Sequence, residues 1–498
     1  MQAVRRVAVT FSIFAVGAVF TAAGCDEGSL PSAPVDAGTD ATAGPAAWNR
    51  PITRPDDATA AATRKSCGYK AGDLPGETLG ASTPVDNDIP IQKIIVLMQE
   101  NRSFDSYYGA LGKFANRTDI NVAPDDATNP EKPGVANSPT HPRQHAPHKC
   151  TLDTDHSWFA QHSDSDNGLN DGFWQANNDP SQPNGTGSGD RALYYYDQTD
   201  LPFYYQLATT FGIADNYHCG ILGPTWPNRM YFYSATSFGH VDNTFPDLTG
   251  KTYPDVMTSI FDELEQRGIS WNIFADSTPG AAVVYASTII SRWNRNPILR
   301  SADLMSAIAA GTLPQVSFID GQLGGEGPAG NDEHPPGDIE IGQKFTADIL
   351  QALTKSPDWQ HVAFFLTYDE NGGFYDHVPA PATCAPDNTA PILSGQDATF
   401  PVGFDHAGFR VPLLVVSPYA KKGYVGHNFY DHTSLTRFIE TKFRLPALTA
   451  RDANADALMD FFDFQNPPFM TPPTLTEPSV DTNEANYCAA TYSKSAGG

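Results

Sequence analysis

The sequence predicts an α/β fold in which a mostly parallel sheet is covered by helices on both faces. Short runs such as residues 94–98 are apolar throughout, which is typical of strands buried on both sides. Between such runs, apolar residues recur three or four positions apart, as from 341 to 353, and this is the period of an amphipathic helix. Strands and helices that alternate along a chain build layered α/β domains.

The elements expected from these patterns follow one another along most of the chain. Gly268 comes directly after one helical pattern and is a typical residue at a helix end. Long polar loops between residues 110 and 200 are expected to form a cap that shapes a substrate pocket. The predicted elements are strand 94–98, helix 255–267, strand 269–274, strand 316–319, helix 341–353, strand 362–366, strand 411–416 and a helix over 435–443.

The composition is that of a folded and strongly acidic chain. Of its 498 residues, 40% are hydrophobic and 11% aromatic, enough for a sizeable core and too many for a disordered chain. The formal net charge of -26 repels the phosphates of nucleic acids, so we expect no nucleic-acid partner. The same charge also keeps a protein surface soluble.

The N-terminus has the layout of an export signal. Two arginines precede an apolar run over residues 7–20, which is too short to cross a bilayer comfortably and is followed by small residues. The stretch that ends at Cys25 resembles a bacterial lipoprotein box, although Ala22 stands where Leu is usual. We expect residues 1–25 to be a lipoprotein-type signal peptide and Cys25 to carry a lipid anchor to a bacterial membrane, facing the periplasm or the cell surface. Plain secretion after cleavage near Ala23 is the alternative.

Three further segments are expected after this signal. The first part of residues 26–85 is rich in Ala, Gly, Pro, Ser, Thr and Asp, and predicts a flexible tether. Residues 86–450 are expected to form the main catalytic domain with its cap insertions, folded from about Ile89 onwards. Residues 451–498 are expected to be a C-terminal extension. After the signal, we find no further stretch with the pattern of a membrane helix.

The cysteine count fits an oxidising compartment. Lipid on Cys25 would leave five cysteines, one of them unpaired, and Cys219 in its compact stretch is the expected free thiol. The other four lie in loop-like surroundings and could form two disulfide bonds in any of three pairings: Cys67, Cys150, Cys384 and Cys488.

Polar residues gather where three of the predicted strands end. Glu100 and Asn101 follow the first strand, and Asp320, Asp369 and Glu370 follow two later ones. Ligands of open α/β sheets bind at the carboxyl ends of the strands, so these residues predict a functional site. Ordinary helix capping is the alternative. Oxygen donors without a thiolate favour one divalent Ca²⁺, Mg²⁺ or Mn²⁺ ion.

Three histidines and one threonine add reactive groups. His156, His334 and His377 lie beside acidic residues, and because histidine also binds zinc, zinc remains an alternative metal. A structural role is the alternative for each histidine. Thr225 comes just before a helical pattern, where free backbone N–H groups and the helix dipole attract phosphate. The alternative role for Thr225 is a helix N-cap.

The chain also carries five longer motifs in a fixed order. They are IIVLMQENRSFDSYYG, GPTWPNR, EHPP, TYDENGGFYDHV and RVPLLVVSPYAKKGYV, supported by the weaker DTDHSW, LPFYYQLATTFGIADNYHCG and YDHTSLTRFIE. Together they span roughly residues 89–445 and resemble the bacterial phosphoesterase family that holds the non-zinc phospholipases C and a group of acid phosphatases. This resemblance implies an alkaline-phosphatase-like α/β fold.

The resemblance implies a metal site and a nucleophile. Glu100 and Asn101 match the first metal-binding pair, and Asp369 and Glu370 match the second. Thr225 matches the nucleophile and completes the expected ligands of one divalent ion.

The resemblance also implies groups that handle the substrate. His156 and His334 match histidines that hold phosphate or the leaving group, and His334 is expected to protonate the leaving alcohol. Asn228, Arg229 and His377 are the expected substrate-binding residues. Trp226 departs from the small or acidic residue common in the family, which implies a different pocket rim.

These features predict a metal-dependent phosphoesterase that works through a phosphothreonine intermediate. A phospholipase C acting on phosphatidylcholine-like lipids is preferred, because the phospholipases of the resembled family have Thr as nucleophile where the acid phosphatases have Ser. An acid phosphatase acting on phosphomonoesters is the close alternative. A non-catalytic surface binding protein is an alternative of another class, against which the intact Thr225 and the two ligand pairs argue.

Overall fold

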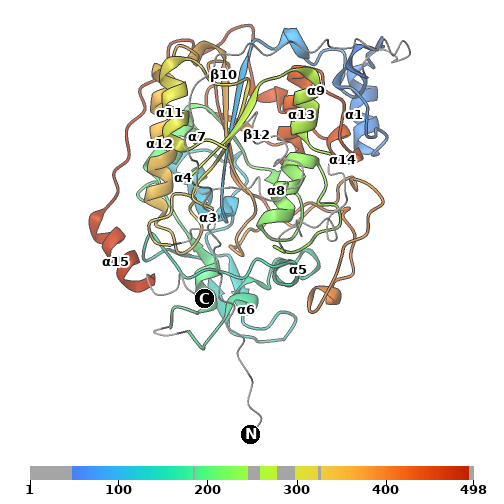
Figure 1. Cartoon of the computed structure of the whole chain (residues 1–498). Helices are drawn as coiled ribbons and strands as arrows, with labels where there is room; N and C mark the ends of the chain where they lie inside the picture. Colours follow the sequence, from blue (N-terminus) through green and yellow to red (C-terminus); the bar gives the residue numbers. More distant parts are fainter. Residues whose placement is uncertain (1–46, 183–184, 245–257, 277–297, 324–326, 493–498) are drawn as a thin grey trace, which may run out of the picture. The chain divides into compact units, whose positions relative to one another are not determined.

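A seven-stranded sheet forms the centre of the computed structural model, which describes residues 47–182, 185–244, 258–276, 298–323 and 327–492. The strand order is β12-β6-β11-β10-β1-β9-β8, and only β11 runs antiparallel to its neighbours among these strands. The predicted mostly parallel sheet is therefore confirmed (Figure 1). The strands are β1 Lys93–Gln99, β6 Gly212–Ala214, β8 Trp271–Ala275, β9 Val316–Asp320, β10 Val362–Tyr368, β11 Leu413–Val416 and β12 Tyr424–Gly426.

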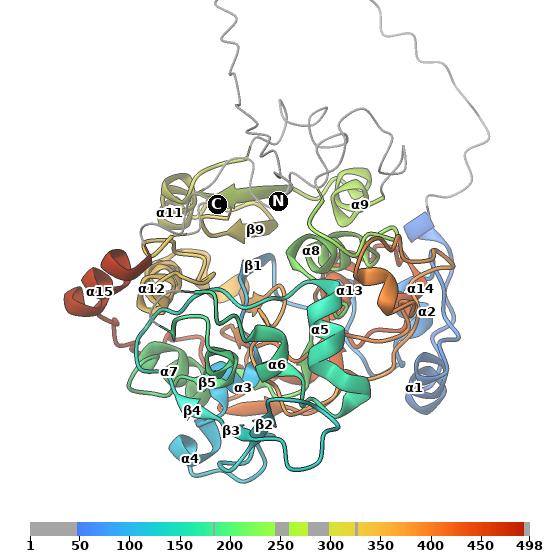
Figure 2. The same ribbon diagram turned by 90° about the horizontal axis from the view of Figure 1, so that it is seen from below.

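Helices cover both faces of this sheet, as predicted. Helices α7, α11 and α12 lie on one face, and α8, α9 and α13 lie on the other (Figures 1 and 2). Helix α12 follows the predicted period, since Ile349 and Leu353 are buried and Asp338 caps its first turn. The bounds are α7 Pro202–Thr210, α8 Thr225–Ser234, α9 Ile260–Arg267, α11 Ser301–Ala310, α12 Ile339–Lys355 and α13 His432–Phe443.

Two predicted elements need comment. The helix predicted over 255–267 is α9 from Ile260 onwards, and its predicted start up to residue 257 lies outside the described residues. The strand predicted over 411–416 is β11, which runs against the others. An apolar run fixes burial but not strand direction, because both directions bury the same side chains.

Two central strands, β1 and β10, bring the candidate residues together. β1 and β10 are parallel and in register from Lys93 opposite Val362 to Gln99 opposite Tyr368. The residues that follow these strands therefore begin at the same edge of the sheet. Short helices and two small sheets from residues 104–195 lie at this carboxyl edge, with α5 and α6 nearest the viewer in Figure 2. They include α3 Phe104–Tyr108, α4 Leu111–Ala115, β2 Thr128–Pro130, β3 Thr140–Pro142, β4 Gln144–His145, α5 Trp158–Ser165, α6 Phe173–Asn177 and β5 Tyr194–Tyr195.

The predicted tether over residues 26–85 needs correction in its second half. From Ala47 onwards the described residues form one compact unit, which includes α1 Asp57–Lys65 and α2 Pro75–Thr78. Gly72 N donates to Ala447 O at 2.7 Å, and Cys67 is bonded to Cys384. Partners more than 300 positions away hold this segment in place, so its local composition did not reveal the fold. Residues 26–46 lie outside the described part.

The predicted C-terminal extension packs onto the same unit. Phe461, Phe462 and Phe469 belong to the main hydrophobic core, and Trp359 Nε1 donates to Phe469 O at 2.9 Å. The predicted boundary at residue 450 therefore does not separate two bodies. The remaining elements are β7 Tyr217–His218, β13 Tyr430–Asp431, α14 Ala450–Ala453 and α15 Thr482–Tyr492.

Two disulfide bonds and one free thiol confirm the cysteine prediction. Cys67 is bonded to Cys384 and Cys150 to Cys488, which selects one of the three pairings. Cys219 is free and buried. Among the described residues, no helix is both long and apolar enough to cross a membrane.

Candidate active site

Two pairs of oxygen-bearing residues meet at the edge where β1 and β10 end. Asn101 N donates to Asp369 Oδ1 at 3.2 Å, and Asp369 N donates to Gln99 O at 3.1 Å. The chain turns sharply here, because Asn101 has a φ of 63° and Gly372 a φ of 65°. A Cβ on Gly372 would stand 2.6 Å from the Asn101 Cβ, so only glycine lets the two turns approach this closely. The two predicted ligand pairs therefore form one cluster.

Arg229 lies beneath these carboxylates rather than in a substrate pocket. It is fully buried, and its Nε donates to Asp369 Oδ2 at 3.1 Å while its Nη1 donates to Asp320 Oδ1 at 2.8 Å. Burial opposes the charge, but Asp369, Asp320 and Glu100 raise the pKa of the guanidinium above its ordinary value. The structure thus replaces the predicted substrate contact of Arg229 with a role in neutralising buried carboxylates.

Asn228 also differs from its predicted role. Its side chain is fully buried, accepts from Ile221 N at 3.0 Å and donates to Gly223 O at 2.7 Å. These bonds hold the turn that leads into Thr225. Asn228 therefore shapes the loop before Thr225, and its buried amide is occupied by backbone groups.

Thr225 is the first residue of α8, and 6% of its surface is exposed. Pro224 precedes it and lines an open cleft of about 580 Å³. The first turn of an α-helix has backbone N–H groups without intrahelical partners and carries the positive end of the helix dipole. Thr225 therefore lies where a phosphate would be stabilised.

Glu370 is fully buried beside His156 and keeps one carboxylate oxygen without a hydrogen bond among the described residues. Its Oε2 accepts from Gln161 Nε2 at 2.8 Å and from Gly372 N at 2.6 Å. Its Oε1 has no hydrogen-bond partner among the described residues, and neither does Oδ1 of Asn101. Burial raises the pKa of Glu370 to about 8, with His156 opposing and Asp369 adding to the shift.

His156 connects this cluster to the cleft. Its Nδ1 donates to Thr154 O at 2.8 Å, so Nε2 points towards Asn101 Nδ2 at 3.5 Å and Glu370 Oε1 at 3.9 Å. Burial lowers the pKa of His156, but Glu370, Asp153 and the Thr154 carbonyl outweigh it and raise the pKa to about 9. The surrounding carboxylates therefore favour the protonated form of the ring.

His334 completes the group from the other side. His156, His334 and Asp153 each offer a ligand atom within 4.8 Å of the others. His334 Nε2 lies 4.0 Å from Asp153 Oδ2, and the two histidine rings are 5.8 Å apart. Two histidines that lie 178 positions apart in the chain thus come close together, and His156 of this pair lines the cleft.

His377 belongs to a second cluster. Its Nδ1 bonds Asp105 Oδ2 at 2.5 Å, and its Nε2 bonds Asn121 Oδ1 at 3.0 Å. Arg410 donates to Asp376 Oδ1 at 2.9 Å in the same cluster. Since both ring nitrogens have protein partners, the structure gives His377 a role in an ion-pair network instead of the predicted substrate contact.

The sequence also matches a known protein family and several known proteins. The model of the Phosphoesterase family matches residues 91–446, which is more than two thirds of the chain. The chain belongs to the Phosphoesterase family. This confirms the predicted family, and the protein is a hydrolase that acts on phosphoester bonds.

Several relatives of this phosphoesterase are phospholipases C. Phospholipase C B of Mycobacterium tuberculosis is 31% identical over 454 residues, which cover 82% of this chain and 85% of that protein. Non-specific phospholipase C1 of Arabidopsis thaliana is 32% identical over 400 residues, covering 76% and 72%. Non-hemolytic phospholipase C of Burkholderia pseudomallei is 32% identical over 442 residues, covering 76% of this chain and 59% of that protein.

A solved structure is also similar. A protein in the alkaline phosphatase superfamily from Vibrio parahaemolyticus aligns over 89% of this chain and 97% of its own, with 9% sequence identity and a TM-score of 0.38.

Sequence reasoning missed two residues of the phosphoesterase site. Asp153 lies three positions before His156 within an acidic run, and this spacing was a usable local signal. Gln161 gave no signal, although its amide joins Glu370 to Gly223 through bonds of 2.8 and 2.9 Å. Its position depends on α5 lying against the loop before Thr225, which is a tertiary contact.

The phosphoesterase site has the features of a cation site. Glu100, Asp320 and Asp369 place three carboxylates around a single buried Arg229, and Glu370 follows Asp369 directly. Oxygen atoms of Asn101 and Glu370 are buried without hydrogen-bond partners among the described residues. Buried acceptors of this kind are normally satisfied, so a bound cation explains them better than an empty space. The donor set is therefore suited to one hard divalent ion.

Proposed function

We propose that this phosphoesterase is a phospholipase C that hydrolyses phosphatidylcholine-like lipids through a phosphothreonine intermediate on Thr225. The observation that carries the proposal is the position of Thr225 at the start of α8, directly after Pro224, which lines the same cleft as His156. The phospholipase C relatives support the substrate class.

The metal in this proposal is one divalent ion, Ca²⁺, Mg²⁺ or Mn²⁺, with zinc as the alternative. Glu100, Asn101, Thr225, Asp369 and Glu370 would hold it, and their oxygen donors support the hard cations. When bound, such an ion lowers the pKa of a hydroxyl group and neutralises charge on a phosphoryl group.

The protein's own groups account for the remaining steps. The Thr225 hydroxyl loses its proton to solvent, and its oxygen attacks phosphorus and forms a P–O bond while the bond from phosphorus to the glycerol oxygen breaks. The leaving diacylglycerol oxygen takes a proton, for which His334 is the donor in this proposal. Water then attacks phosphorus, gives one proton to His334, and breaks the P–O bond to Thr225, whose oxygen takes a proton from solvent as the phosphorylated head group leaves. Positively charged His156 would stabilise the phosphoryl oxygens throughout.

The charge of the cleft supports a cationic head group. Asp155, Asp179, Asp242 and Asp397 line it, together with Asp153. Carboxylates close to the phosphate site attract a quaternary ammonium or ammonium group and repel a purely anionic substrate. This observation favours a lipid such as phosphatidylcholine over an anionic phosphomonoester.

A paired assay tests the proposal. Purified protein with added divalent metal should release phosphocholine from phosphatidylcholine faster than it releases phosphate from p-nitrophenyl phosphate. The reverse preference would favour the acid phosphatase alternative. No turnover of either substrate with any of the four metals would favour the non-catalytic binding protein.

We also propose that the protein is exported and anchored by a lipid on Cys25. The two disulfide bonds support export, because such bonds persist in oxidising compartments. An anchored enzyme would work on lipids at the periplasmic face or cell surface.

A further inference from the structure

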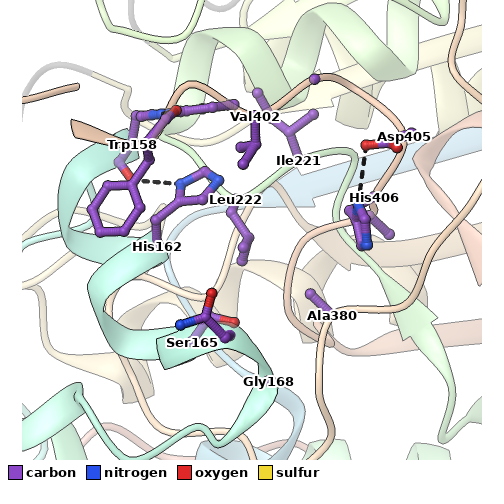
Figure 3. A pocket seen from close by; sticks show the side chains of 14 residues that line it. Trp158, His162, Ser165, Gly168, Ile221, Leu222, Ala380, Val402, Asp405 and His406 are labelled. Atoms are coloured by element: carbon purple, nitrogen blue, oxygen red, sulfur yellow. Dashed lines mark hydrogen bonds and ion pairs between the residues drawn. The ribbon is translucent and has the colours of Figure 1, made fainter. Parts of the chain in front are cut away.

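A second cavity lies beside the catalytic cleft and shares a wall with it. It has a volume of about 560 Å³, within the range of small-molecule sites, and we name it the α5 pocket after the helix that lines it. Its apolar lining includes Trp158, Ile221, Leu222, Ala380, Phe400 and Val402. In Figure 3, Trp158 and His162 stand on one side, Asp405 and His406 on the other, and Leu222 lies between them.

Two residues that line the α5 pocket lie close in sequence to Thr225, the proposed nucleophile. Ile221 and Leu222 line it, and Thr225 follows Leu222 three positions later. Trp158 lines both this pocket and the catalytic cleft. A Cβ on Gly223 would stand 3.7 Å from Trp158 Cε3, so the indole packs against the loop that carries Thr225. Trp158 therefore stands between the cleft and the α5 pocket, next to the loop that leads to Thr225.

The inner surface of the α5 pocket is uncharged. His162 stacks between Trp158 and Phe400, with ring centres 4.1 and 5.3 Å away. Burial lowers the pKa of His162 to about 4, and its Nδ1 bonds Trp158 O at 2.7 Å, so its ring is neutral at neutral pH. The side chains of Asp405 and His406, which also line the pocket, are more than half exposed. The inner surface of the α5 pocket is thus apolar, whereas the cleft is acidic.

The geometry points to the α5 pocket as the site that receives the acyl region of the substrate lipid, and this inference rests on the proposed phospholipase function. One phospholipid has a charged head and an apolar body on either side of its phosphate. The site has an acidic cleft and an apolar pocket on either side of Trp158. Placing the acyl region in the pocket leaves the cationic head group in the cleft, where the carboxylates are.

Short-chain substrates give the test. Wild-type protein should show a kcat/KM for monomeric phosphatidylcholines that rises about fourfold for each methylene buried, from dibutanoyl to dihexanoyl chains. Val402 is 43% exposed, so Val402→Asp should fold normally and place a charge in the pocket wall. In this variant, kcat/KM should no longer rise with acyl chain length, and kcat/KM for dihexanoylphosphatidylcholine should fall at least tenfold. Turnover of p-nitrophenyl phosphocholine, which has the same head group and no acyl chain, should stay within twofold.

Two controls make the result decisive. Val135 is 55% exposed and does not line the pocket, so Val135→Asp should leave the turnover of both substrates unchanged. Ala380→Phe, which fills the pocket without adding charge, should shorten the chain length that still improves kcat/KM. An unchanged chain-length series in both pocket variants overturns the inference. So does an equal loss on p-nitrophenyl phosphocholine, which would place the head group in the pocket. Wild-type protein that hydrolyses neither choline ester would instead refute the proposed function itself.

Discussion

At the scale of single residues, the site separates groups that face the cleft from groups that hold them in place. Glu370 Oε1 and Asn101 Oδ1 are buried acceptors without hydrogen-bond partners in the described part of the chain, whereas Asp369 is occupied by Arg229. Removing Asp369 would strand a buried guanidinium, which is costly in itself. Substitutions at residues that do not neutralise Arg229 therefore give cleaner tests.

The first residue-scale prediction concerns the nucleophile. Thr225→Val keeps the branched shape and removes the hydroxyl, so kcat should fall by at least about 10³-fold while the melting temperature stays unchanged. Thr225→Ser keeps the hydroxyl and should retain measurable turnover. Steady-state kinetics on phosphatidylcholine with circular dichroism melting would check both. A folded Thr225→Val protein with near-normal kcat would exclude the phosphothreonine route.

The second residue-scale prediction concerns the metal. Glu370→Gln keeps the size of the side chain but removes the charge from a proposed ligand, so the affinity for the divalent ion and kcat should both fall by about 100-fold or more. Glu263→Gln on α9 is the matched control and should leave both unchanged. Elemental analysis after dialysis would report the metal. Wild-type protein that is fully active with no bound metal would contradict the prediction.

At the scale of elements, parallel pairing of β1 with β10 places two polar strand ends side by side. The turns after these strands then fold against each other, and Gly372 is where they come closest. Helix α5 closes the arrangement, since Gln161 bonds both the Glu370 carboxylate and the loop before Thr225.

The element-scale prediction tests this close approach. In Gly372→Ala, a positive φ costs about 1–2 kcal/mol, and the new Cβ would also meet Asn101 Cβ at 2.6 Å. Both stability and metal affinity should fall. Gly395 has a φ of 54° with no atom within 4 Å of such a Cβ, so Gly395→Ala isolates the backbone cost. Equal melting temperatures for the two variants would mean that the turns do not need this contact.

At the scale of the whole molecule, long-range links join the ends of the chain to its centre. The Cys67–Cys384 bond spans 317 positions and the Cys150–Cys488 bond spans 338. Bonds that close loops of this length restrict the unfolded chain most strongly. They hold the N-terminal and C-terminal segments on a body whose core is formed by the central sheet and its helices.

The first whole-molecule prediction concerns these bonds. The double variant Cys150→Ser with Cys488→Ser should lose about 2–5 kcal/mol of unfolding free energy. Urea unfolding at fixed pH would measure the loss, and adding a reductant should lower the stability of wild type by more than that of the variant. Identical unfolding curves for wild type with and without reductant would show that the disulfides add nothing to stability.

The second whole-molecule prediction concerns location. Several acyl chains on a lipoprotein N-terminus hold a protein stably at a membrane, whereas one chain does so only marginally. Cys25→Ser should therefore move the protein from the membrane fraction to the soluble fraction with its specific activity unchanged. Cell fractionation of both forms provides the measurement. If wild type and variant are equally soluble, plain secretion replaces the lipid anchor.

The sequence by itself determined the fold class, the core strands and the residues at their ends. Apolar runs predict buried strands because burial is a property of the side chains in the run, and polar residues directly after a strand must lie at the sheet edge. Glu100, Asn101, Asp369 and Glu370 meet there. The motif order was sufficient to predict the family, since a specific set of strand ends and turns recurs in one order.

Tertiary structure alone decided which polar residues face the cleft and which are buried beneath it. Arg229 and His377 looked like substrate ligands in the sequence, but Arg229 is paired with Asp320 and Asp369, and His377 Nδ1 bonds Asp105 from a distant segment. For the same reason, the sequence did not reveal the role of Gln161, the disulfide pairing or the folded segment from Ala47. Each depends on partners far away in the chain, and the local pattern of a sequence carries information about its neighbours but not about what packs against it.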